Sequence, residues 1–97
     1  MRLRWSQPAR DDLARLHDFL APVNPEAAIA AVQELLLGVE QLPFNPRLGR
    51  SLDIYRPRDV RRLVVGLYEI RYEVRDEDII IVRLFHGRED RPSGLLP

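Results

Sequence analysis

Apolar residues recur along the chain with two different periods, and the change comes near residue 60. In the first part of the chain they return every three or four residues, which is helical spacing. Ser6 and Asn24 are suitable N-caps, each is followed closely by a proline, and a further proline marks where each helical stretch should end. We therefore expect two helices, over about 7–21 and 25–42, packed as an antiparallel hairpin because their connection is short.

The later part of the chain alternates as β-strands do. Residues 68–74 place apolar side chains on one face and charged side chains on the other, which predicts a half-buried antiparallel strand. Residues 79–86 form a near-continuous apolar run, which predicts a central strand covered on both faces. With strands at 61–65 and 2–5, the order is β-α-α-β-β-β. This order predicts the α+β class, with a curved antiparallel sheet and a helical hairpin packed on one face.

Composition narrows the class of protein. A chain of 97 residues, of which 45% are apolar, is long enough for one small folded domain, and we expect that domain over residues 1–90 with a tail at 91–97. The absence of cysteine excludes a disulfide scaffold and a thiolate metal site. No apolar run approaches the roughly 20 residues of a membrane span. The first residues are too charged for a signal peptide, so we expect a cytoplasmic protein.

The charge is balanced overall but uneven along the chain. All 15 cationic side chains are arginine, none is lysine, and 15 acidic residues cancel them. A protein that binds nucleic acid nonspecifically usually has a strong basic excess, which this chain lacks. Residues 11–40 carry six acidic residues and one arginine, whereas residues 47–62 carry six arginines and two acidic residues. Such a charge asymmetry would attract and orient a charged partner during association. Alternatively, the two segments are simply charged faces exposed to solvent.

No standard catalytic motif is present, and no pair of carboxylates has a spacing that demands acid–base work. His86 ends the apolar strand beside a glycine, where functional groups often lie, although a structural histidine would fit there as well. Asp11 and Asp12 fall early in the first helix, where the helix dipole favours negative charge. The two histidines of the chain are too few for a metal site, so we expect neither a metal nor a cofactor.

Arg83 is the one charged residue inside the apolar run. A buried arginine must be paired with an acid or reach solvent. Glu69 and Glu73 on the adjoining strand are the candidate partners, and the sequence does not choose between them. Alternatively, Arg83 lies on an open concave surface of the sheet with Arg61 or Arg62, where clustered arginines would bind an acidic partner or a phosphate.

Several short segments, spread in order through nearly the whole chain, form a recognisable series. They are Trp5-Ser6, Ala9-Arg10-Asp11-Asp12-Leu13, Ala27-Ala28, Leu42-Pro43, Asn45-Pro46-Arg47-Leu48-Gly49-Arg50, Arg61-Arg62-Leu63-Val64-Val65, Tyr68-Glu69-Ile70-Arg71-Tyr72 and Ile81-Val82-Arg83-Leu84-Phe85-His86-Gly87-Arg88. This series resembles the ParE toxins of the ParE/RelE superfamily, and residues 46–50 look like the family's P-x-x-G-R loop.

The resemblance implies a toxin of a type II toxin–antitoxin system, a class associated with growth arrest and plasmid stabilisation. Such a toxin is held silent by a cognate ParD-like antitoxin that typically has a ribbon-helix-helix DNA-binding domain and a flexible tail. ParE members are described as inhibitors of DNA gyrase, and so of DNA replication, that do no chemistry themselves. The resemblance therefore implies no catalytic residue and no cofactor.

Two sets of residues suit these two partners. For the antitoxin we expect the wide apolar face of the second helix and the arginine-rich middle segment, namely Leu36, Leu37, Arg47, Arg50, Arg58, Arg61 and Arg62. For the target we expect the end of the last strand and the tail, namely Arg83, His86, Arg88 and Arg91. The exposed apolar strip also predicts a homodimer or a toxin–antitoxin hetero-oligomer.

Two other functions remain open. A ribosome-dependent mRNA endoribonuclease of the RelE branch would need cations and a proton donor, which Arg61 or Arg62, Arg83, Arg88 and His86 would supply. Zero net charge and the lack of lysine count against it, because nucleases of that branch are usually lysine-rich and basic. The third reading is a non-toxic member of the family that acts only as a binding module.

Overall fold

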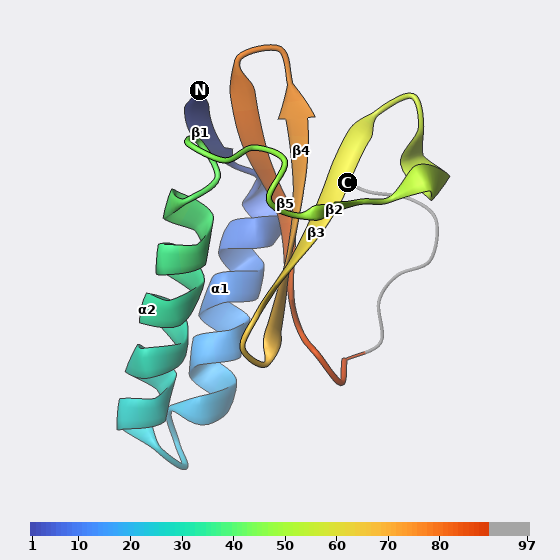
Figure 1. Cartoon of the computed structure of the whole chain (residues 1–97). Coiled ribbons are helices and arrows are strands. Elements are labelled where there is room, and N and C mark those ends of the chain that lie inside the picture. Colours follow the sequence, from blue (N-terminus) through green and yellow to red (C-terminus); the bar gives the residue numbers. More distant parts are fainter. Residues whose placement is uncertain (90–97) are drawn as a thin grey trace.

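The computed structural model describes residues 1–89, which form two α-helices on one side of a five-stranded sheet (Figure 1). The elements in chain order are β1 (Arg2–Trp5), α1 (Gln7–Leu20), α2 (Pro25–Glu40), β2 (Arg50–Ser51), the short 3-10 helix η1 (Asp53–Tyr55), β3 (Asp59–Val65), β4 (Tyr68–Arg75) and β5 (Asp78–His86). The predicted α+β class and helical hairpin are confirmed. Within the described residues neither helix has the length and hydropathy of a membrane span.

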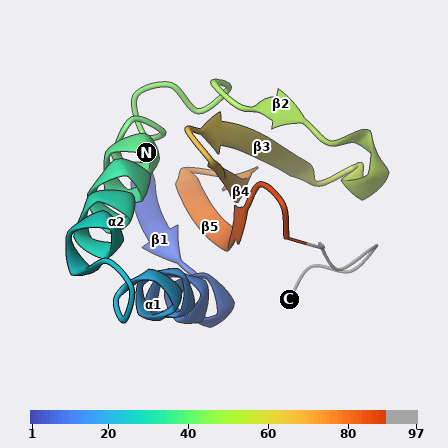
Figure 2. The same cartoon turned by 90° about the horizontal axis from the view of Figure 1, so that it is seen from below.

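The sheet has the strand order β1-β5-β4-β3-β2 and curves from β1 round to β2 (Figure 2). Its pairs are antiparallel except for β1 and β5, which run parallel, so the sheet is mixed. β1 and β5 are neighbours in the sheet although both helices and three strands separate them along the chain. The apolar run predicts a central strand. β5 has a neighbouring strand on both sides only over its first part, where β1 pairs with it.

The helices begin where the capping residues predict. The Ser6 hydroxyl accepts a hydrogen bond from the backbone N–H of Ala9 at 3.1 Å, and the Asn24 side-chain oxygen accepts one from Ala27 at 3.1 Å. In both helices a proline occupies the first turn, where its missing N–H has no intrahelical partner to lose. The ends lie at most two residues from those predicted.

The hydrophobic core lies between the helical hairpin and the sheet. Its largest fully buried side chains from α2 and the residues after it are Leu35, Val39 and Leu42, and the sheet contributes Ile70, Tyr72, Ile79, Ile81 and Leu84. Val60 and Phe85 are also fully buried or nearly so, but they lie outside this cluster. Gly38 allows α2 to approach the sheet closely, because a Cβ there would lie 2.8 Å from a methyl group of Val65. The helical half of the chain thus covers one face of the strands.

A buried tyrosine fastens the loop after α2 to the sheet. The Tyr72 hydroxyl donates to the carbonyl oxygen of Pro46 at 2.8 Å and accepts from the backbone N–H of Gly49 at 2.8 Å. Burial raises the pKa of the Tyr72 phenol, so the hydroxyl stays a donor at neutral pH. Because β2 follows directly after Gly49, this contact sets where β2 pairs with β3.

We expect Tyr72→Phe to lower the free energy of unfolding by about 1–3 kcal/mol, because it leaves two buried backbone groups without a partner. Chemical denaturation would measure the loss. Tyr55→Phe is a matched control, since the Tyr55 hydroxyl only accepts one longer hydrogen bond, 3.3 Å from Arg71. Equal losses in the two variants would contradict the role given to Tyr72.

Candidate functional site

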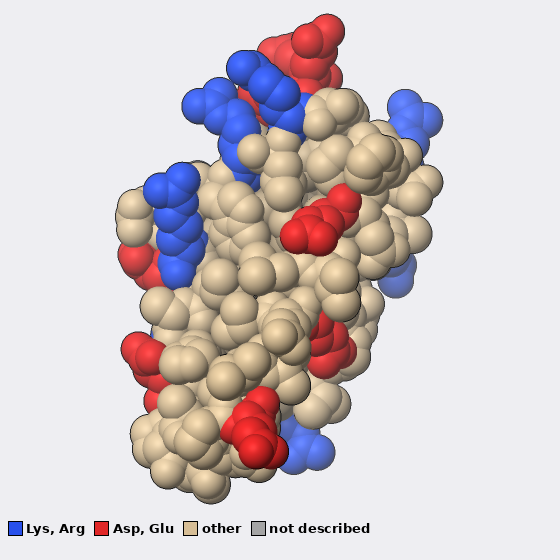
Figure 3. All heavy atoms as spheres, turned by 90° about the vertical axis from the view of Figure 1, so that its left-hand side faces the viewer, with Lys and Arg blue, Asp and Glu red and all other residues tan. Residues whose placement is uncertain are grey.

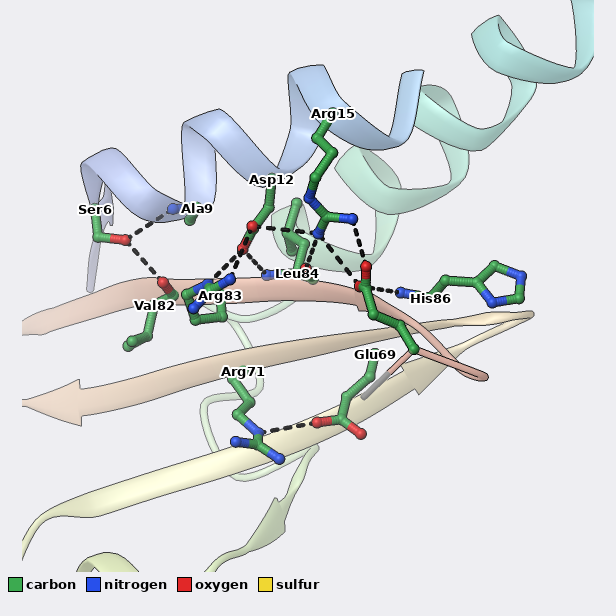
Figure 4. Close-up of polar contacts among 11 residues, drawn as sticks. Ser6, Ala9, Asp12, Arg15, Glu69, Arg71, Val82, Arg83, Leu84 and His86 are labelled. Atoms are coloured by element: carbon green, nitrogen blue, oxygen red, sulfur yellow. Dashed lines mark hydrogen bonds and ion pairs between the residues drawn. The ribbon is translucent and has the colours of Figure 1, made fainter. Parts of the chain in front are cut away.

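The second half of β5 has no strand on its outer side, and α1 takes that place. β1 pairs only with the first part of β5, up to Ile81. Beyond that point the Ser6 hydroxyl donates to the carbonyl oxygen of Val82 at 2.9 Å, and the backbone N–H of Leu84 donates to the Asp12 carboxylate at 2.9 Å (Figure 4). Side chains of α1 therefore satisfy backbone groups that a neighbouring strand would otherwise bind.

Asp12 is also the partner of Arg83. Two guanidinium nitrogens of Arg83 lie 2.7 and 3.1 Å from the two carboxylate oxygens, and Asp12 is only 3% exposed (Figure 4). The prediction that Arg83 pairs with Glu69 or Glu73 is therefore wrong. The register explains the difference, since it places Arg83 directly opposite Arg71 and not opposite a carboxylate.

The assignment of Asp12 to the helix dipole is wrong as well. Asp12 lies beyond the first turn of α1, and its carboxylate points down onto β5 and away from the helix end (Figure 4). Its neighbour Asp11 is exposed and accepts a hydrogen bond from the Gln7 side chain at 2.9 Å. Adjacent aspartates thus have unrelated roles, because consecutive helical positions point about 100° apart.

The carboxylates of β4 are buried on the face of the sheet away from the helices. Glu69 forms ion pairs with Arg71 at 3.0 Å and with Arg62 at 3.2 Å, and it is 2% exposed. Glu73 is paired in the same way with Arg58 and Arg75, at 2.9 and 3.0 Å. The hydrogen bond from Arg58 is the main reason that the pKa of Glu73 is lowered. This face of the sheet is therefore a layer of ion pairs in which two buried carboxylates are each shared by two arginines.

The arginines predicted to bind the antitoxin do not form one cationic patch. Arg58 and Arg62 are paired with the carboxylates of β4. Arg61 points to the opposite side of β3, where it pairs with Asp59 at 2.9 Å and donates to the Gly49 carbonyl at 3.0 Å. Arg47 and Arg50 are exposed and have no ion pair among the described residues. That these residues bind an antitoxin stays a prediction.

The apolar strip predicted on the second helix is present. Leu37 is 64% exposed, Ile29 is 54% exposed, and Leu36 is half-buried beside them. Figure 3 shows that the face of the molecule that carries α2 is mostly neither acidic nor basic, with scattered acidic side chains on it and basic side chains mainly toward its margins. The acidic residues of α2 are Glu26, Glu34 and Glu40, and α2 has no arginine.

The turn after β5 brings together two of the residues predicted to contact the target. The His86 ring stands edge-on to the Tyr68 ring with centroids 5.6 Å apart, and its Nδ1 accepts from the backbone N–H of Arg88 at 3.2 Å. The Arg88 guanidinium is exposed and has no ion pair within residues 1–89. Arg83 is held apart from this pair by Asp12. Arg91 lies outside the described residues.

An ion pair with α1 holds this turn in place. The carboxylate of Glu89 accepts from the backbone N–H of His86 at 3.2 Å and forms an ion pair with Arg15. Arg15 in turn lies 3.3 Å from Asp12, so the turn and the edge of β5 belong to one polar network (Figure 4). The sequence offers no signal for this network, because the link between its two parts, from Arg15 to Glu89, spans 74 positions.

A groove of about 500 Å³ runs between α1 and this turn. Its apolar wall is made of Leu16, Phe19 and Leu20 from α1 with Leu67 and Tyr68 from the sheet, and His86, Arg88, Arg15 and Glu89 complete it. Phe19 is 80% exposed and Leu67 is 69% exposed. Sequence analysis missed this groove, and the only available signal was Phe19, an aromatic residue on the polar side of the helical pattern.

No metal site is found in the described part of the chain, since no three histidine, aspartate or glutamate side chains gather there. The arrangement offers instead an apolar groove beside one unpaired cation. Exposed apolar surface of this kind is typical of sites that bind another macromolecule.

We expect Asp12→Ala to lower the free energy of unfolding by about 3 kcal/mol, because it leaves Arg83 and the Leu84 N–H without their shared partner. Asp11→Ala is the matched control and should change stability by less than about 0.5 kcal/mol. Chemical denaturation of both variants would measure this. Similar losses at the two positions would contradict the arrangement.

Glu73 should make stability depend on pH in the acidic range. Its pKa in the folded protein is lower than the usual value of about 4.5, so the pair stabilises the fold above that pH and the stabilisation is lost as the pH falls. In Arg58→Ala the pKa of Glu73 should move back up, and the loss of stability below pH 4.5 should be shallower. Denaturation curves at several pH values would test this. Arg56→Ala, which removes a fully surface-exposed pair with Asp53, should leave the slope unchanged.

Comparison with known proteins places the chain among toxins. A family model described as "ParE toxin of type II toxin-antitoxin system, parDE" matches residues 3–91. The chain is 32% identical to the protein named Toxin RelE3 of Caulobacter vibrioides over 87 residues, which are 86% of this chain and 90% of that protein. It is 35% identical to Toxin ParE1 of Mycobacterium tuberculosis over 65 residues, which are 66% of this chain and 65% of that protein.

The fold is shared with solved toxin–antitoxin structures. The structure titled "Chromosomal ParDE TA system from P. aeruginosa" matches with a TM-score of 0.75 and 27% identity over 89% of this chain and 95% of that chain. The toxin–antitoxin complex RelBE2 from Mycobacterium tuberculosis matches in fold, with a TM-score of 0.57 at 23% identity over 88% and 95% of the two chains. With the family model matching nearly its whole length, the chain belongs to the ParE toxin family of type II toxin–antitoxin systems.

Proposed function

We propose that this toxin inhibits DNA gyrase, and so DNA replication, by binding to it without chemistry of its own. As a toxin of a type II toxin–antitoxin system, it has an antitoxin as its partner. We propose a ParD-like antitoxin with a ribbon-helix-helix DNA-binding domain. A gyrase inhibitor acts where the chromosome lies, so the proposal puts the protein in the cytoplasm.

The observation that carries the proposal is the pairing of the arginines. A ribonuclease would need cations aimed at a phosphate and an acid–base pair at the 2′-hydroxyl and the leaving oxygen. Arg83 is paired with Asp12, Arg62 with Glu69, and Arg61 points to the other side of the sheet. These arginines are therefore held in ion pairs or face different sides of the sheet and do not converge on one phosphate site, which supports binding over catalysis.

The runner-up is an mRNA endoribonuclease of the RelE branch. It is kept because one relative that spans most of the chain is named Toxin RelE3. In that function His86 and Arg88 would be the acid–base and charge-stabilising groups that remain available. A non-toxic binding module is the third candidate.

Induction of the protein alone in a bacterial host separates these candidates. Linearised plasmid DNA with intact mRNA, together with loss of supercoiling by purified gyrase, is the result we expect. Cleavage of mRNA on ribosomes with normal supercoiling would replace the gyrase function by the ribonuclease. Healthy cells with neither effect would leave only the binding module.

The double variant His86→Ala/Arg88→Ala should lose toxicity and keep the fold, because it removes the exposed cation and the ring that supports the turn. Colony counts after induction would measure toxicity, and far-UV circular dichroism would check the fold. Arg56→Ala is the control, since Arg56 is an exposed arginine that directly follows η1 and lines neither hollow beside this turn. Full growth arrest by a folded double variant would overturn this site assignment.

A further inference from the structure

The His86–Glu89 turn forms a ridge between two hollows of different chemistry. On the α1 side lies the groove of about 500 Å³ with its apolar wall. On the other side lies a hollow of about 220 Å³, lined by Arg62, Val64, Glu69 and Gly87 among others. Leu67, Tyr68, His86 and Arg88 line both hollows, so the two form one continuous surface.

The larger hollow is suited to apolar side chains. Its volume lies in the range of about 300–1,000 Å³ that is typical of binding pockets. Phe19 and Leu67 stand at its opposite sides, and both are largely exposed in the free protein. A partner that covers these two side chains would gain from the burial of apolar surface.

The smaller hollow is suited to a carboxylate. Arg88 has no ion pair among the described residues, and the Arg62 side chain, which shares Glu69 with Arg71, is 37% exposed. A carboxylate placed between these arginines would be bound by charge-assisted hydrogen bonds. The partner's segment must then present apolar side chains to one side of the ridge and an acidic side chain to the other.

We propose that this surface is where the toxin docks on its target, through a gyrase segment that combines large apolar side chains with a carboxylate. The inference rests on the proposed function and specifies which part of the toxin performs it. Continuity with His86 and Arg88 favours the target as the occupant. The antitoxin has a separate apolar surface available on α2, around Leu36 and Leu37, and the charged residues of that helix are all acidic.

A second copy of the chain fits this surface less well. In a second copy, the surface that combines exposed apolar and acidic residues lies on α2. The contact would therefore join α2 of one copy to the ridge of the next. Such a head-to-tail contact does not close unless the rotation between copies happens to form a ring. Self-association is therefore one of the outcomes that the test must distinguish.

The Arg15–Glu89 ion pair makes Arg15 a positioning residue for this surface. It ties the ridge to α1 and so sets the distance between Phe19 and Leu67 across the groove. Arg15 does not need to touch the partner to act in this way, because it acts through Glu89 and the backbone of His86.

Binding of purified gyrase to the immobilised full-length toxin tests the proposal. We expect Phe19→Ser/Leu67→Ser to weaken binding at least tenfold and Arg88→Gln to weaken it similarly, with partial recovery in Arg88→Lys because the charge returns. Ile54→Ser and Arg56→Gln are matched controls, since Ile54 is 75% exposed in η1 and Arg56 lies next to the same element. These controls should bind within twofold of the wild type, and all variants should keep the wild-type melting temperature and antitoxin affinity.

Three results would overturn the proposal. The first is wild-type gyrase affinity in the ridge variants. The second is a loss of antitoxin affinity in those variants, which would make the antitoxin the occupant. The third is a wild-type toxin that self-associates in light scattering and becomes monomeric in Phe19→Ser/Leu67→Ser.

The proposed function can fail separately. If the wild-type toxin binds no gyrase, the proposed gyrase function is wrong. Growth arrest by the ridge variants Phe19→Ser/Leu67→Ser and Arg88→Gln then tests whether this surface binds a different target. Harmless ridge variants that keep their antitoxin affinity would then support this surface for another target. Full growth arrest by them would overturn it.

Discussion

The structure depends on one buried carboxylate. Asp12 accepts hydrogen bonds from the Arg83 guanidinium and from the Leu84 backbone, and so it joins the first helix to the last strand across 71 and 72 positions of sequence. A carboxylate that is 3% exposed would be costly without these partners, and Arg83 would otherwise be a cation inside an apolar strand. Each group therefore makes the burial of the other possible.

This contact also covers the strand edge of β5 that β1 leaves unpaired. β1 is too short to cover β5, and a bare edge would leave backbone donors and acceptors free to pair with another chain. Ser6, Asp12 and Arg15 lie along one side of α1 and bind Val82 and Leu84 in place of a strand. From Arg15 the same network continues to Glu89 and the His86 backbone. The stability of the fold and the shape of the candidate docking surface thus share one set of contacts.

The distribution of charge explains how a chain with so many arginines is suited to protein partners. On the outer face of the sheet each buried glutamate is flanked by two arginines, so four arginines are held in ion pairs there. Arg71 and Arg83 also lie 5.3 and 5.0 Å from the centre of the Phe85 ring, where the aromatic face attracts a cation. These arginines are held in place by their partners, whereas Arg88 stays available beside an apolar groove.

The sequence by itself determined the elements and the class of fold. The caps at Ser6 and Asn24, the alternation in residues 68–74 and the apolar run at 79–86 all act through local geometry, which does not depend on the rest of the chain. The ordered segments from Trp5 to Arg88 likewise indicated the toxin family, because a family is identified by which residues occur in which order along the chain.

Only the tertiary structure decided which charged groups meet. Arg83 was expected opposite a glutamate of the neighbouring strand, yet the register puts Arg71 there and Asp12 arrives from a helix. The groove beside His86 and the Arg15–Glu89 ion pair could not be predicted from the sequence either. The physical reason is that periodicity specifies which face a side chain occupies, whereas its partner is set by strand register and helix placement, which arise only when distant segments pack together.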